Sequence, residues 1–185
     1  MNIFIDGFQN TGKSTLIDNC NFKHNRFPFN QYMDEFSLDI NTYQIGKDLG
    51  ILFGLQYNEE PVIFDRGPFS TIFYSLKENR YGNKTIEIVF KFLKEIATFK
   101  NCRFVWIKKI NNKESIIREH NDGFDYLDDE NDLEKDKLLD QIIQMAESVG
   151  IKLYIFENDF SISLKENYHR FNNLLGELIN EYNRN

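Results

Sequence analysis

The chain has 185 residues, of which 41% are hydrophobic and 15% aromatic, and both values are typical of one compact folded domain. Acidic residues outnumber Lys and Arg by 29 to 22, giving a formal charge of −7. That charge argues against nucleic acid as the main partner, because phosphate backbones are bound by clustered Lys and Arg. Cys20 and Cys102 lie far apart without a CxxC spacing, which predicts neither a disulfide framework nor a zinc site. We therefore expect a cytoplasmic protein, and no apolar run approaches membrane-spanning length.

The first predicted element is a strand, NIFID at residues 2–6, which runs directly into a glycine-rich loop. Residues 7–14 read GFQNTGKS and satisfy the pattern G-x-x-x-x-G-K-[ST]. In such loops the glycines allow successive backbone N–H groups to meet phosphate oxygens at the start of a helix. The sequence therefore predicts a nucleoside triphosphate site.

Individual roles follow from the loop chemistry. Lys13 is expected to bridge the β- and γ-phosphates, and Ser14 to bind magnesium through its hydroxyl group. The other positions predicted to contact the nucleotide are Gly7, Asn10, Thr11, Gly12 and Thr15. The guanine-reading pattern N-K-x-D is broken at residues 112–115, which read NKES, and this favours ATP over GTP.

A weak strand is predicted next at residues 26–29, where Pro28 favours an edge position, followed by a stronger strand, PVIFD at 61–65. The stronger strand ends at Asp65 and continues into Arg66, so a carboxylate and a guanidinium leave the sheet together. Asp65 is predicted to hold magnesium or to position the acceptor, and Arg66 to stabilise charge on a phosphate. The alternative is a structural ion pair at the start of a loop.

The second half of the chain keeps alternating between helical and strand patterns. In order, it holds a helical stripe at 86–96, the strand RFVWI at 103–107, an acidic stretch at 122–136, a helical stripe at 138–145, the strand KLYIF at 152–156 and a last helical stripe at 164–179. The acidic stretch is interpreted as a solvated loop entering a helix rather than a metal site. The alternation predicts right-handed βαβ units and hence an α/β fold with three α/β/α layers around a five-stranded parallel sheet.

Two motifs make the chain resemble the thymidylate kinase and deoxynucleoside kinase group of P-loop enzymes. IDGFQNTGKST at 5–15 resembles that group's acid-glycine-x4-GKST start, and DRGPFSTIFY at 65–74 resembles its Asp-Arg or Glu-Arg motif. In spacing, Arg118 resembles the arginine that opens the family's lid, which places a lid-like segment around 109–130. The resemblance implies ATP and Mg²⁺ as cofactors, catalytic roles for Lys13, Asp65, Arg66 and Arg118, and a homodimer.

The acceptor side departs from this family. Gln9 stands where thymidylate kinases carry an aspartate, and RFPFNQYMDE at 26–35 replaces the family's R-E-P type segment. A monophosphate acceptor needs cations such as Arg66 to screen repulsion between phosphates, whereas a 5′-hydroxyl needs a nearby carboxylate, for which Asp6 or Asp65 is suited. The resemblance favours Asp6 in that catalytic role. The alternative is that Asp6 hydrogen-bonds neighbouring loop amides.

The sequence thus favours ATP-dependent phosphoryl transfer to a small acceptor, first of all a deoxynucleoside monophosphate. A deoxynucleoside kinase acting on the 5′-hydroxyl is the second interpretation. A polynucleotide 5′-kinase is the third, and the net charge disfavours it. From another class, a non-catalytic nucleotide-binding regulatory protein is kept open by a lid segment that is poor in arginine.

Overall fold

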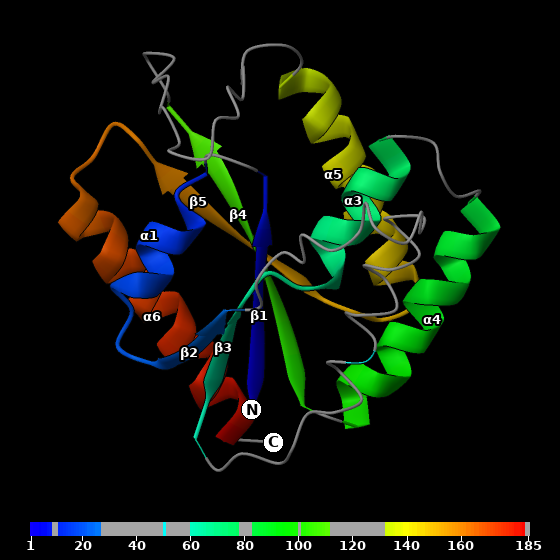
Figure 1. Ribbon diagram of the computed structural model, residues 1–185, viewed down its shortest axis with the longest axis horizontal. Coiled ribbons are helices and arrows are strands. Elements are labelled where there is room, and N and C mark those ends of the chain that lie inside the picture. Colours follow the sequence, from blue (N-terminus) through cyan, green and yellow to red (C-terminus); the bar gives the residue numbers. More distant parts are fainter. Residues whose placement is uncertain are drawn as a thin grey trace, which may run out of the picture.

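The computed structural model describes residues 1–8, 11–26, 50, 60–77, 83–99, 101–111 and 132–183. Within these residues, five parallel strands form one sheet in the order β2-β3-β1-β4-β5 (Figure 1). The strands are β1 (Asn2–Gly7), β2 (Lys23–Arg26), β3 (Val62–Asp65), β4 (Cys102–Ile110) and β5 (Leu153–Asp159). The predicted α/β fold with a five-stranded parallel sheet is therefore confirmed.

Helices cover both faces of this sheet. They are α1 (Lys13–Asp18), α3 (Pro68–Lys77), α4 (Asn83–Phe99), α5 (Asp132–Ser148) and α6 (Leu164–Asn183). Figure 1 shows α1 and α6 on one side of the sheet and α3, α4 and α5 on the other, which gives the three predicted layers. None of the described helices is long and apolar enough to cross a membrane.

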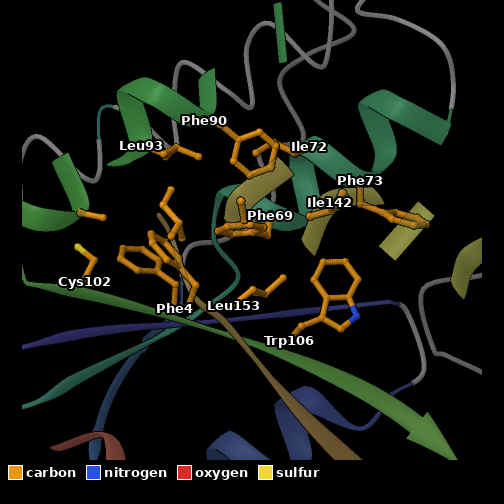
Figure 2. Packing of buried hydrophobic residues seen from close by; sticks show 14 of the residues in the cluster. Phe4, Phe69, Ile72, Phe73, Phe90, Leu93, Cys102, Trp106, Ile142 and Leu153 are labelled. Atoms are coloured by element: carbon orange, nitrogen blue, oxygen red, sulfur yellow. The ribbon is translucent and has the colours of Figure 1, made fainter. Parts of the chain in front are cut away.

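The two faces of the sheet carry different cores. Under α3, α4 and α5 the core is rich in aromatic rings, among them Phe4, Phe69 and Trp106 (Figure 2). The Phe4 and Phe64 rings are stacked at 4.8 Å, and the Phe69 and Phe104 rings lie 5.0 Å apart. The opposite core, under α1 and α6, is mainly aliphatic. Because side chains alternate along a strand, β1 contributes to both cores and all six of its residues are buried. The loop after β1 therefore begins from a strand held on both faces.

Two edges of the sheet differ from the sequence prediction. The edge strand β2 (Lys23–Arg26) begins three residues before the strand predicted at 26–29, and residues 27–29 of that prediction lie outside the described residues. Its sequence KHNR has no apolar pattern, and it pairs with β3 through backbone hydrogen bonds. At the other edge, the continuous apolar run KLYIF is typical of a strand covered on both faces, yet Ile155 of β5 is 38% exposed. Leu164, placed in a core stripe by its spacing, is 57% exposed at the start of α6.

Candidate nucleotide and phosphoryl-transfer site

The loop after β1 depends on two glycines. Gly7 has a φ of +146°, and a Cβ atom there would lie 2.5 Å from the carbonyl oxygen of Ile107 on β4. Gly12 has a φ of +78°, in the left-handed region, directly before α1. Between them, the Thr11 hydroxyl donates to the carbonyl oxygen of Phe8 at 3.0 Å and helps to close the loop. A side chain at Gly7 would therefore push the loop away from β4, and one at Gly12 would strain its left-handed backbone.

Lys13 is buried inside the turn that this loop makes. Its side chain is 7% exposed, and its Nζ donates to the carbonyl oxygens of Gly7, at 3.0 Å, and Phe8. Burial, together with the positive charge of Arg66, lowers the pKa of the Lys13 ammonium to about 8, while Asp65 and Asp6 act in the opposite direction. A buried ammonium held by neutral carbonyls gains Coulomb energy from an anion brought into the loop.

At the end of β3 a hydroxyl and a carboxylate come together. Ser14 Oγ donates to Asp65 Oδ2 at 3.2 Å, and Asp65 is 8% exposed. These are oxygen ligands of the kind that Mg²⁺ takes when it also binds substrate phosphates and water. Within the described part of the chain, no group of three or more His, Cys, Asp or Glu side chains is placed to hold a metal. The pair therefore offers two oxygen ligands that suit a magnesium ion.

Arg66 follows Asp65 with a strained backbone. Its φ is +80°, uncommon for a residue with a side chain, and its amide donates to the carbonyl oxygen of Ile5 at 3.0 Å. The side chain is exposed, and its charge acts on the pKa of Lys13. The two cations therefore act on the same edge of the sheet, one buried and one in solvent.

Asp6 is fully buried beneath the start of α3. Its Oδ1 accepts three hydrogen bonds, from Gly67 N at 2.9 Å, Ser70 N at 3.1 Å and Ser70 Oγ at 2.6 Å, whereas Oδ2 has no hydrogen-bond partner. Burial raises the pKa of the Asp6 carboxyl despite these three donors. The carboxylate satisfies amides that the first turn of a helix leaves free. This geometry favours the interpretation that Asp6 bonds neighbouring amides over that of a catalytic base.

The remaining predicted site residues divide into two groups. The first group lies at the carboxyl edge of the sheet and comprises Lys13, Ser14, Asp65 and Arg66. Next to it, Thr11 lies in the loop and Thr15 at the start of α1. Asn10, Arg118 and most of the lid-like segment lie outside the described residues.

A cavity of about 210 Å³ lies beside the loop, between α1, the end of β5 and the start of α6. Its lining combines Gly12 of the loop and Thr15 of α1 with apolar side chains such as Leu16, Phe160 and Tyr168. Asn158, which sequence reasoning missed, also lines this cavity. The available signal was its position after the buried run of β5, since polar residues beyond the carboxyl ends of parallel strands line ligand sites.

Comparison with known proteins bears on the fold. Neither a protein-family model nor a curated protein sequence matches the chain. A solved structure of deoxyadenosine kinase from M. mycoides with bound dATP matches with a TM-score of 0.54 and 18% identity, over 95% of this chain and 100% of that one. The chain has the fold of a P-loop deoxynucleoside kinase. The resemblance stated from the two motifs thus extends to the whole fold, while the acceptor has to be argued from the site.

Proposed function

We propose that this chain is a phosphotransferase that binds ATP with Mg²⁺ and transfers the γ-phosphoryl group to the 5′-hydroxyl of a small nucleoside. One observation carries the proposal. The hydroxyl of Ser14 and the carboxylate of Asp65 lie 3.2 Å apart beside a loop that buries the ammonium of Lys13. Loop amides, a cation and a pair of magnesium ligands are the parts that phosphoryl transfer requires, because catalysis there rests on positioning and charge stabilisation.

The donor nucleotide fits these residues part by part. The loop amides and Lys13 would bind the phosphates, with the ammonium exchanging its bonds to carbonyl oxygens for bonds to phosphate oxygens. Ser14 and Asp65 would hold the magnesium ion, which neutralises charge on the phosphates when it is bound. The 210 Å³ cavity next to Gly12, with its partly apolar lining, suits the flat base of the donor.

The acceptor side supports a nucleoside first and a monophosphate second. The neighbour whose fold matches nearly the whole chain is a deoxyadenosine kinase, and for this reason we propose a 5′-hydroxyl ahead of the monophosphate that the sequence favoured. Arg66, exposed at the same edge, would stabilise the transferring phosphoryl group. The same exposed guanidinium is the observation that keeps a monophosphate as the second candidate. With Asp6 bonded to α3, Asp65 is the carboxylate that we place near the reacting groups.

The test is a panel of deoxynucleosides and their monophosphates with Mg-ATP, read as ADP release and as phosphorylated product. We expect at least one deoxynucleoside to raise ADP release above the acceptor-free rate, and to raise it more than any monophosphate does. Lys13→Ala is the control and should lower this rate at least about 100-fold with the far-UV circular dichroism unchanged. Lack of stimulation by every acceptor would contradict the proposal and favour a nucleotide-binding regulatory protein. A Lys13→Ala protein with the wild-type rate would refute the assignment of the loop.

A further inference from the structure

We propose that Asn158, at the end of β5, is a positioning residue that fixes the orientation of the phosphate loop. The inference rests on the proposed function, because it concerns the loop to which the donor phosphates are assigned. Asn158 is 4% exposed, and its Nδ2 donates to the carbonyl oxygen of Thr11 at 2.8 Å. This buried hydrogen bond joins residues 147 positions apart in the chain and ties the loop after β1 to the far edge strand of the sheet.

The bond acts on a single peptide unit. In a trans peptide the C=O of one residue and the N–H of the next point in opposite directions, and the described residues contain no cis peptide. A donor that holds the Thr11 carbonyl toward β5 therefore holds the Gly12 N–H away from β5. Backbone N–H groups of this loop are the groups that would bind phosphate. Asn158 thus sets the direction of one of them without touching the nucleotide phosphates itself.

The fit between Asn158 and the loop is close. A Cβ atom added at Gly12 would lie 2.7 Å from Asn158 Nδ2, so glycine at this position allows both the left-handed φ and the close approach of Asn158. The other atom of the amide, Oδ1, is buried without a hydrogen-bond partner. A buried acceptor without a partner costs stability, and an apolar side chain at this position would avoid that cost. The carboxamide is therefore better explained by the donor it offers to Thr11 than by stabilisation of the core.

A second buried asparagine holds the turn beyond Asn158. Asn167 is 2% exposed, accepts from Asp159 N at 3.1 Å and donates to the carbonyl oxygen of Asp159 at 2.7 Å. These bonds fix the segment that carries Phe160 and Ile162 along the 210 Å³ cavity. Two asparagines of similar burial thus act on two neighbouring structures, Asn158 on the phosphate loop and Asn167 on the wall of the proposed base pocket.

This division gives a matched pair of variants. Isothermal calorimetry would measure the binding of Mg-ATP and of Mg-tripolyphosphate, which has no base, to the full chain and to Asn158→Ala and Asn167→Ala. We expect Asn158→Ala to weaken both ligands by about tenfold, the loss expected of one buried hydrogen bond. Asn167→Ala should weaken Mg-ATP but change the affinity for Mg-tripolyphosphate by less than about twofold.

An isosteric variant guards against a general loss of structure. Asn158→Asp keeps the size of the side chain, removes the donor and sets a carboxylate against the Thr11 carbonyl, so we expect a loss of tripolyphosphate affinity at least as large as that of Asn158→Ala. Far-UV circular dichroism would check the fold of all three variants. Wild-type affinity for tripolyphosphate in Asn158→Asp, or equal losses in Asn158→Ala and Asn167→Ala for both ligands, would overturn the inference. A wild-type chain that binds neither ligand would overturn the proposed function, and the inference with it.

Discussion

The loop after β1 and the turn after β3 meet at one edge of the sheet, yet they hold their cations in opposite ways. The loop buries Lys13 against carbonyl oxygens of its own residues, Gly7 and Phe8. The turn leaves Arg66 exposed, and backbone amides of Gly67 and Ser70 beside it donate to the carboxylate of Asp6 on the neighbouring strand. The Lys13 ammonium is therefore held by carbonyl oxygens a few residues away in the chain, whereas the turn beside Arg66 is held by a carboxylate that the sheet brings from about 60 residues away.

In the loop one residue both carries the charge and stabilises the fold, whereas in the turn two residues divide these roles. In the loop, the side chain proposed to bind phosphate is itself part of the folded structure, because its ammonium fills the turn. In the turn after β3, the charged Arg66 side chain is exposed, and the hydrogen bonds accepted by Asp6 stabilise the backbone instead. We therefore expect changes at Lys13 to alter ligand binding and the pH dependence together, and changes at Asp6 to alter stability first.

The largest expected effect is on stability at Asp6. Asp6→Ala leaves three buried donors at the start of α3 without their acceptor, but it also removes the cost of burying a carboxyl group. We expect a net loss of about 3 kcal/mol in the free energy of unfolding. Urea denaturation would measure this loss. Asp6→Asn is the matched control, since its amide oxygen can still accept, and it should lose less than half as much. An Asp6→Asn protein of wild-type stability whose turnover fell more than about 100-fold would instead restore Asp6 as the catalytic base.

A smaller effect is expected from pH at Lys13. The ammonium attracts phosphate only when it is protonated, and its pKa of about 8 lies below the ordinary 10.5. Mg-ATP should therefore bind about tenfold more weakly at pH 9 than at pH 7. Between pH 8 and 10.5 Lys13 is largely deprotonated in the folded chain but protonated in the unfolded chain. The free energy of unfolding therefore rises with pH in this window, because the cost of burying the charge is lost. Calorimetry at several pH values would check the binding, with Lys13→Met as a control whose weak affinity should not change. Equal wild-type affinity at pH 7 and pH 9 would contradict the burial of the charge.

The smallest effect is on the backbone at Arg66. Because its φ of +80° suits glycine, Arg66→Gly should be more stable than Arg66→Ala by about 1 kcal/mol in thermal or urea unfolding. Both variants lose the guanidinium, so both should transfer phosphoryl groups more slowly by a similar factor. Equal stability of the two variants would show that the turn relaxes and stores no strain at this position.

The sequence by itself predicted the features that are encoded locally. The glycine-rich loop is encoded by eight consecutive residues, and four of the five strands are short apolar runs between helical stripes. Pattern and spacing were therefore sufficient to predict these elements. Ser14 and Asp65 were each predicted separately as magnesium ligands, and the structure brings them 3.2 Å apart at the carboxyl edge of the sheet. The start of β2 at Lys23 was missed, because KHNR has no hydrophobic pattern and its pairing with β3 uses backbone hydrogen bonds.

Tertiary structure alone decided what joins these pieces. Whether Asp6 acts on a substrate or on α3 depends on β1 lying next to β3, which brings the first turn of α3 over its carboxylate. The bond from Asn158 to Thr11 depends on how the end of β5 meets the loop after β1, two strands away in the sheet. These two contacts join residues 61 and 147 positions apart, and they depend on the order of the strands in the sheet. No local sequence pattern encodes that order. The sequence therefore determined which groups were candidates for the chemistry, and the packing of the strands determined which of them lie together at the edge of the sheet and which bond to its helices and loops.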